Sequence, residues 1–184
     1  MNNITNIPEY DIDAVIAWVD GTDPLFQDKL ANSLKYLNYQ GNPEEYSQDR
    51  FSPHYDIFTC VLSIRRFAPF IRNIHIVTDQ QDPGIIKYLE TIDVTWADKV
   101  KIVDHTQIFS EYLDVLPVFN SLSIETMLYR IPGLAEHYIY FNDDFFLTRN
   151  VKTSDFFVDG LPKIRGYVSG NNSLSARYDI SKAK

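Results

Sequence analysis

The chain alternates short apolar runs with segments whose apolar residues recur at helical spacing. Four of the runs are rich in branched and aromatic residues: 12–19, 74–78, 100–103 and 138–141. Runs of this length and composition are typical of strands that are covered on both faces of a sheet. Because helical patterns separate them, we predict an α/β fold in which helices flank a mostly parallel sheet.

Helices are predicted between these strands. Asp23 followed by Pro24 provides a favourable N-cap and first helical position, and apolar residues at helical spacing continue from there. The polar segment 40–55, which contains prolines and has no apolar period, is expected to be an exposed loop of the kind that often serves a site. The expected helices run from the Asp23 cap to Gly41, over 57–67, over 85–89, and from an Asn120 cap through Leu128.

The length and charge of the chain restrict its class. Its 184 residues, 45% of them hydrophobic, suffice for one compact domain, and no repeat or clear linker divides residues 1–184. The formal net charge of -8 leaves no basic stripe that could neutralise a phosphate backbone. We therefore predict a single domain that does not bind nucleic acid.

The cysteine content and the apolar pattern bear on location. The single cysteine, Cys60, cannot close an intramolecular disulfide, which agrees with a reducing compartment. The first ten residues lack the basic-then-apolar pattern of a signal peptide, and no apolar stretch reaches the roughly 20 residues needed to span a bilayer. A cytoplasmic protein is expected, and peripheral contact with a membrane stays open.

Polar and acidic residues follow each predicted strand directly. The carboxyl ends of parallel strands lie along one edge of a sheet, which is where ligands bind in open α/β folds. We therefore expect these side chains to border a single crevice. They are Asp20 and Asp23 after the first strand, Asp79 after the second, Asp104 and His105 after the third, and Asn142, Asp143 and Asp144 after the fourth.

The most informative segment is IYFNDDFF, residues 139–146, where two adjacent aspartates lie in strongly apolar sequence. Two carboxylates about 4 Å apart repel each other by roughly 4 kcal/mol at an effective dielectric constant of about 20, so they need compensation to stay ionised. A hard divalent cation, Mg²⁺ or Mn²⁺, would supply it, with Asp143 and Asp144 as ligands. The alternative is a turn in which Asn142 and Asp143 bond the backbone and Asp144 caps the next segment.

The turn after the first strand, DGTD, is open to two interpretations. Gly21 permits close approach of the backbone to a ligand, and Asp20 would then hold a ribose hydroxyl or a base edge. Trp18 is near enough in sequence to border a base or a sugar. In the alternative, Asp23 is an N-cap and Gly21 an ordinary turn residue. Neither a P-loop nor a dinucleotide-binding glycine pattern occurs in the chain.

Among the histidines, His105 is the best candidate for proton transfer or phosphate binding, because it follows a strand end and has an ordinary pKa of about 6.5. Its alternative role is that of a helix-entry residue. His75 and His137 fall in or beside strands and are expected to be structural, as is Cys60 on the apolar face of its helix. Guanidinium groups of the kind that suit a pyrophosphate come from Arg50, Arg65, Arg66 and Arg72, although most of these are expected simply to be solvated.

Taken together, these segments resemble the Stealth family, whose members include capsular polysaccharide phosphotransferases. IDAVIAWVDGTDP, residues 12–24, is similar to the first conserved region of the family. Ordered blocks within 50–160 are similar to the second, among them SIRRFAPFIRNIHIVTDQQDP, KIVDHTQIF, LPVFNSLSIE and YRIPGLAEHYIYFNDDFFL. The third and fourth conserved regions have no counterpart before Lys184, so we expect a fold that is incomplete at its C-terminus.

The resemblance implies a nucleotide-sugar transferase fold of the GT-A kind that uses Mg²⁺ or Mn²⁺. The implied reaction transfers a sugar-1-phosphate from a UDP-sugar to a hydroxyl of a sugar or oligosaccharide acceptor, with release of UMP, in capsular or exopolysaccharide synthesis. Peripheral association with a capsule-assembly complex at the inner membrane would fit this role. The resemblance implies that Asn142, Asp143 and Asp144 form the metal and donor-phosphate site. Together with the residues argued above, the predicted donor-binding residues are Trp18, Asp20, Gly21, Asp23 and Asn142, the metal ligands Asp143 and Asp144, and the catalytic residues His105, Asp144 and Arg50.

Two other functions stay open at this point. A metal-dependent glycosyltransferase could use the same fold and release UDP, because its acceptor attacks the anomeric carbon. A non-catalytic fragment would bind the nucleotide sugar without turning it over. The nucleotide released separates the two enzymes, and the absence of turnover identifies the fragment.

Overall fold

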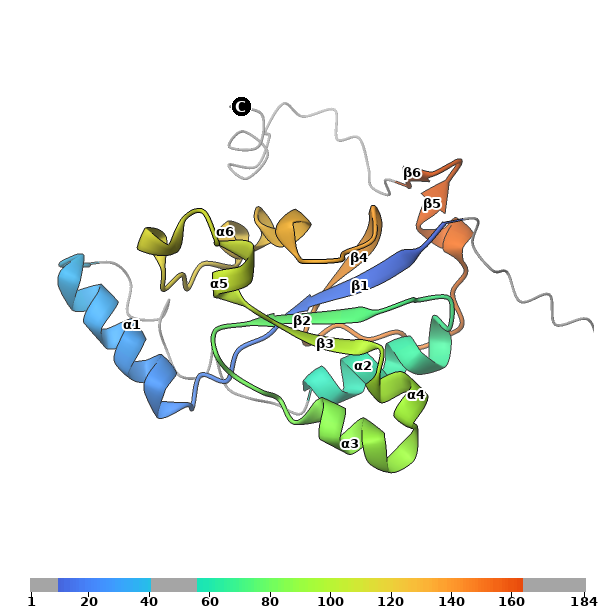
Figure 1. Ribbon diagram of the computed structural model, residues 1–184, viewed down its shortest axis with the longest axis horizontal. Helices are drawn as coiled ribbons and strands as arrows, with labels where there is room; N and C mark the ends of the chain where they lie inside the picture. The colour runs from blue at the N-terminus through green and yellow to red at the C-terminus, as the bar shows by residue number, and fades with distance from the viewer. Residues whose placement is uncertain (1–9, 41–55, 164–184) are drawn as a thin grey trace, which may run out of the picture.

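A parallel sheet of four strands forms the centre of the computed structural model, which describes residues 10–40 and 56–163 (Figure 1). The strand order is β3-β2-β1-β4, and every neighbouring pair is parallel. The predicted arrangement of helices around a parallel sheet is therefore confirmed, and it is compatible with a GT-A-like fold. The strands are β1 Ile12–Ala17, β2 Ile74–Thr78, β3 Val100–Asp104 and β4 His137–Asn142.

Helices cover both faces of this sheet. Figure 1 shows α2, α3 and α4 on one face, α5 and α6 on the other, and α1 projecting beyond the strand ends. None of the helices in the described ranges is long and apolar enough to cross a membrane. The helices are α1 Pro24–Tyr36, α2 Asp56–Phe67, α3 Ile85–Ile92, α4 Val94–Ala97, α5 His105–Ile108 and α6 Ser121–Glu125, and a short antiparallel pair, β5 Phe157–Val158 and β6 Leu161–Pro162, follows β4.

The core has two layers because side chains alternate across each strand. Ile12, Ala14 and Ile16 of β1 belong to the cluster that includes the apolar residues of α2 and α3. Val15, on the other face of β1, joins a second cluster that includes Val77 and residues of α5. Burial on both faces explains why the strands read as continuous apolar runs.

Two helices end earlier than their apolar spacing predicts. We expected the first helix to reach Gly41, but α1 ends at Tyr36 and the backbone at Asn38 turns to a φ of 46°. Within the described ranges Phe26 is the one buried residue of α1, so little burial favours a longer helix. The helix expected through Leu128 ends at Glu125, where the Met127 N–H donates to the carbonyl three residues back.

A buried charge lies within β1, at the end opposite the strand carboxyl ends. Asp13 is fully buried and accepts hydrogen bonds from Arg72 at 2.7 and 2.9 Å and from the backbone N–H groups of Asn73 and Ala135. His75 Nε2 lies 3.0 Å from the same carboxylate. Although burial alone would raise the pKa of Asp13, the hydrogen bonds from His75 and Arg72 hold it well below its usual range. The structural role expected for His75 is confirmed.

Candidate active site

The four sheet strands end at one edge, with their last residues in register. Ala17 of β1 pairs with Asn142 of β4, and Thr78 of β2 pairs with Asp104 of β3. A cavity of about 410 Å³ opens beside this edge, a volume usual for small-molecule sites. Its lining brings together residues from all four strand ends: Trp18, Asp79, His105, Asn142, Asp143 and Asp144.

The tandem aspartates make one part of this lining acidic. They follow β4 in a turn closed by a hydrogen bond from the Phe145 N–H to the Asn142 carbonyl, 3.0 Å long. Burial and the neighbouring charge of Asp144 raise the pKa of Asp143. Burial and the same two charges raise the pKa of the Cys60 thiol to about 12, so this cysteine is a core residue as predicted. A bound cation would relieve the repulsion between the two carboxylates.

His105 faces the same cavity from the start of α5. Its side chain is only 5% exposed, and its Nδ1 has no hydrogen-bond partner within the described ranges. Burial lowers the pKa of His105, although the charges of Asp79 and Asp104 oppose that change. The imidazole is therefore neutral at pH 7. His105 is also the first residue of α5, so the two roles weighed for it are compatible.

Aromatic side chains make another part of the wall. Trp18, Phe26, Phe119 and Tyr140 line the cavity, and the rings of Phe26 and Phe119 pack edge to face with centroids 5.5 Å apart. Burial, followed by the charge of Glu125, raises the pKa of Tyr140 to about 12, so its hydroxyl keeps its proton. This wall offers flat apolar surface to a base or a sugar ring.

The DGTD turn lies beside the cavity and lines a neighbouring hollow with Trp18, which borders both. Asp20 Oδ1 accepts from the backbone N–H of Thr22 at 2.8 Å, and Asp23 Oδ1 accepts from the Leu25 N–H at 2.9 Å. Asp23 is thus the N-cap of α1, which was one of its two predicted roles. The Gly21 carbonyl accepts from a side-chain amide of α1. Contact of this turn with a ligand stays a prediction.

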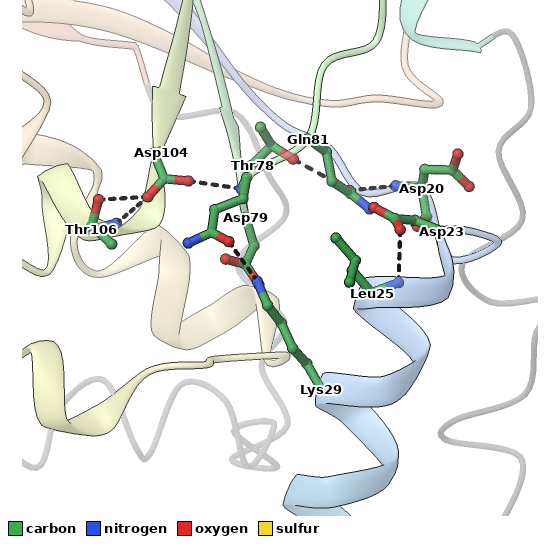
Figure 2. A network of polar contacts seen from close by, with 10 residues as sticks. Asp20, Asp23, Leu25, Lys29, Thr78, Asp79, Gln81, Asp104 and Thr106 are labelled. Atoms are coloured by element: carbon green, nitrogen blue, oxygen red, sulfur yellow. Dashed lines mark hydrogen bonds and ion pairs between the residues drawn. The ribbon is translucent and has the colours of Figure 1, made fainter.

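Two residues that the sequence patterns did not single out connect these segments (Figure 2). Lys29 of α1 places its Nζ 2.8 Å from Asp79 Oδ2 and 3.3 Å from the side-chain oxygen of Gln80. Gln81, which is 9% exposed, bonds the backbone of Asp20 with both ends of its amide. Neither contact has a signal in the sequence, because each joins residues at least 50 positions apart.

The charge of the cavity wall favours a cation. Among the described residues that line it there are three aspartates and no lysine or arginine. Nowhere in the described ranges do three or more His, Cys, Asp and Glu side chains gather closely enough to hold a metal by themselves. Asp143 and Asp144 nevertheless fit Mg²⁺, which commonly binds through one or two carboxylates and takes its other oxygens from water and substrate phosphates.

Among the described residues, no arginine lines the cavity. Arg50, the predicted catalytic arginine, lies outside the described residues. Arg65 pairs with Asp93 at 2.7 Å, and Arg72 is bound to Asp13 at the opposite end of β1. Arg65 and Arg72 are therefore engaged by a helix C-cap aspartate and a buried carboxylate, and neither lines the cavity.

Comparison with known proteins adds a family. Residues 50–164 match the family described as Stealth protein CR2, conserved region 2, and residues 10–35 match Stealth protein CR1, conserved region 1. The longer match covers more than half of the chain. It contains every cavity-lining residue of β2, α5 and β4, while the shorter one contains Trp18 and the DGTD turn.

Several curated relatives are similar over most of the chain. A capsular polysaccharide phosphotransferase of Actinobacillus suis is 40% identical over 149 residues, which are 80% of this chain and 38% of the relative. One of Neisseria meningitidis serogroup B is 39% identical over 82% of this chain and 39% of its own. An exopolysaccharide phosphotransferase of Lactiplantibacillus plantarum is 39% identical over 84% and 42%. The chain thus spans about two fifths of the length of these relatives.

Proposed function

This chain belongs to the Stealth family, and from that membership and the geometry of its cavity we propose that it binds a UDP-sugar and transfers sugar-1-phosphate to a sugar hydroxyl, releasing UMP. The relatives named as capsular and exopolysaccharide phosphotransferases support a place in polysaccharide synthesis. The observation that carries the proposal is the meeting of Trp18, His105 and the tandem aspartates in one cavity at the strand ends.

Asp143 and Asp144 would hold the Mg²⁺ or Mn²⁺ that this function needs. When bound, the ion would neutralise negative charge on the donor diphosphate, which no lysine or arginine among the described lining residues does. A diphosphate brought to this acidic wall without a cation would be repelled. The charge of the wall therefore predicts that donor binding depends on the metal.

The remaining lining residues suit the other parts of the reaction. Trp18 and the edge-to-face pair of Phe26 and Phe119 offer surface on which the uracil or the sugar can pack. Asn142 can donate its amide to a donor oxygen at the mouth of the acidic turn. His105, neutral at pH 7, can accept the proton of the attacking acceptor hydroxyl from its place in the cavity wall.

The decisive experiment identifies the released nucleotide. The protein is incubated with a panel of UDP-sugars, Mg²⁺ and capsular oligosaccharides, and the products are separated by anion-exchange chromatography. We expect UMP and a sugar-phosphate-sugar diester. Release of UDP would instead establish a glycosyltransferase, and Mg²⁺-dependent binding without any product would establish a non-catalytic nucleotide-sugar-binding fragment. Asp144→Asn serves as the matched inactive control.

A further inference from the structure

Gln81 lies in the turn that follows β2, and its buried side-chain amide bonds the turn that follows β1 (Figure 2). Its Nε2 donates to the Asp20 carbonyl at 2.9 Å, and its Oε1 accepts from the Asp20 N–H at 2.8 Å. The same Nε2 donates to Asp23 Oδ2 at 3.0 Å, and the Thr78 hydroxyl donates to Oε1 at 3.4 Å. One side chain therefore bonds both the backbone of the DGTD turn at Asp20 and the side chain of Asp23, the N-cap of α1.

The Trp18 N–H donates to the Val77 carbonyl at 2.9 Å, so Trp18 is itself fixed to β2, and the Gln81 bonds fix the DGTD residues that follow it. The bonds that Asp20 and Asp23 make to Thr22 and Leu25 join residues two positions apart, so they shape the turn without placing it on the sheet. Gln81 is 61 residues from Asp20 and 58 from Asp23. The hydrogen bond from Gln81 is also the main reason why the pKa of Asp23 lies below its ordinary value.

An ion pair between Lys29 and Asp79 also joins α1 to the turn that follows β2. Asp23 caps α1, and Lys29, which lies later in that helix, reaches back to Asp79 at 2.8 Å. Asp79 lines the cavity and lies two residues before Gln81. The segments 20–29 and 79–81 are thus joined at both ends, by a neutral amide at one end and an ion pair at the other.

We propose that Gln81 is a positioning residue for the nucleotide-sugar donor, because it holds the DGTD turn against the end of β2, directly after Trp18 in the cavity wall. The proposal rests on the proposed function, because it names a residue that prepares the same site. Trp18 borders both the cavity and the hollow that Gln81 lines, so a displacement of the turn moves cavity wall as well. Gln81 itself does not line the cavity.

The test compares UDP binding in MgCl₂ by calorimetry for the unmodified protein and two variants. Gln81→Met keeps the length of the side chain and loses every hydrogen bond. Gln81→Glu keeps an acceptor for the Asp20 N–H but sets a carboxylate against the Asp20 carbonyl and the Asp23 carboxylate. We expect UDP to bind about tenfold more weakly to Gln81→Met, the effect of one or two lost hydrogen bonds, and more weakly still to Gln81→Glu.

Arg65→Met is the control for a general loss of stability, since it removes the ion pair with Asp93 without touching the turn. It should lower the melting temperature and leave UDP affinity within about twofold. Amide exchange is measured in parallel: residues 18–23 should exchange faster in both Gln81 variants, while α2 is unchanged.

The possible results separate this inference from the proposed function. If UDP binds the unmodified protein and both Gln81 variants equally, the positioning role is wrong and the donor site stands. If Arg65→Met weakens binding as much as Gln81→Met does, the effect is one of stability and the positioning role is again wrong. If the unmodified protein does not bind UDP at all, the proposed function fails and the positioning role fails with it.

Discussion

Ala17 pairs with Asn142 where β1 and β4 lie side by side, and this register brings the turn beginning at Trp18 next to the aspartates at 143 and 144. The two segments are about 125 residues apart along the chain and leave the sheet at neighbouring points of one edge. Trp18 and both aspartates line the same cavity, while the DGTD turn that follows Trp18 lines the neighbouring hollow. The geometric premise of the proposed donor site, that these segments meet, is thus a property of the sheet.

Replacing Asp13 should be among the most destabilising changes in the chain. Asp13→Asn leaves Arg72 and His75 without the carboxylate that they share in the core, and we expect a loss of about 3–5 kcal/mol in the free energy of unfolding. Because the pKa of Asp13 is lowered in the fold, its contribution is present above the unfolded pKa and is lost as pH falls. Urea denaturation at pH 7 measures it.

Asp11→Asn is the matched control for that change. Asp11 bonds the same Arg72 at 3.1 Å, but its side chain is 67% exposed, so its loss should cost less than about 1 kcal/mol. Equal losses in the free energy of unfolding for the two substitutions would show that burial of the Asp13 carboxylate does not add to its contribution.

Asp143 should make the metal-free protein less stable as pH rises. Its pKa is raised above the ordinary value of 3.8, so its contribution to stability is fully present below that value and is lost as pH rises through the raised pKa. Asp143→Asn lacks this titration. In EDTA, the melting temperature of the variant minus that of the unmodified protein should therefore increase between about pH 3.5 and pH 7. A gap that stays constant would contradict the raised pKa.

Cys60 should be almost inert towards thiol reagents in the folded protein. The thiol is fully buried and its pKa is raised to about 12, whereas a free cysteine titrates at about 8.5. Labelling with a disulfide reagent at pH 8 should be at least about 100-fold slower than in the urea-unfolded chain, since both access and thiolate are lacking. Equal rates would place Cys60 at the surface.

His105→Gln should reduce turnover more than binding. We expect a fall of about 100-fold in kcat, the usual contribution of a general base, with UDP affinity changed less than about twofold. His137→Gln is the control, because that ring bonds the Gly160 carbonyl beside the β5–β6 pair and lies outside the cavity lining. Equal losses of affinity and kcat in His105→Gln would assign it a binding role only.

The strands were predictable because a covered parallel strand leaves a short, unbroken apolar run with a polar residue at its end. The end of α1 was not, since Leu34 and Leu37 continue the helical spacing although neither is buried. Asp13 had a signal that the patterns of apolar residues obscure: a lone charge inside a buried strand requires a partner.

The polar contacts of the site were less accessible to sequence reasoning. The strand-end rule placed all the polar residues that follow the strands along one crevice. The structure gathers Asp79, His105 and the Asn142–Asp144 segment in one cavity. Asp20 and Asp23 line the neighbouring hollow instead, and Asp104 is the N-cap of α5, so the prediction of a single crevice is wrong for these three. Lys29 and Gln81 were not predicted, because their roles depend on side-chain contacts between distant segments rather than on any period or motif.

The central claim is that the Trp18 turn and the tandem aspartates act on one metal-held diphosphate, and the emission of Trp18 tests it most directly. Trp96→Phe leaves Trp18 as the single tryptophan of the chain. We predict that UDP quenches its emission in MgCl₂ but not in EDTA, and that Asp143→Asn or Asp144→Asn abolishes the response. Quenching that persists in EDTA, or in both aspartate variants, would contradict the account.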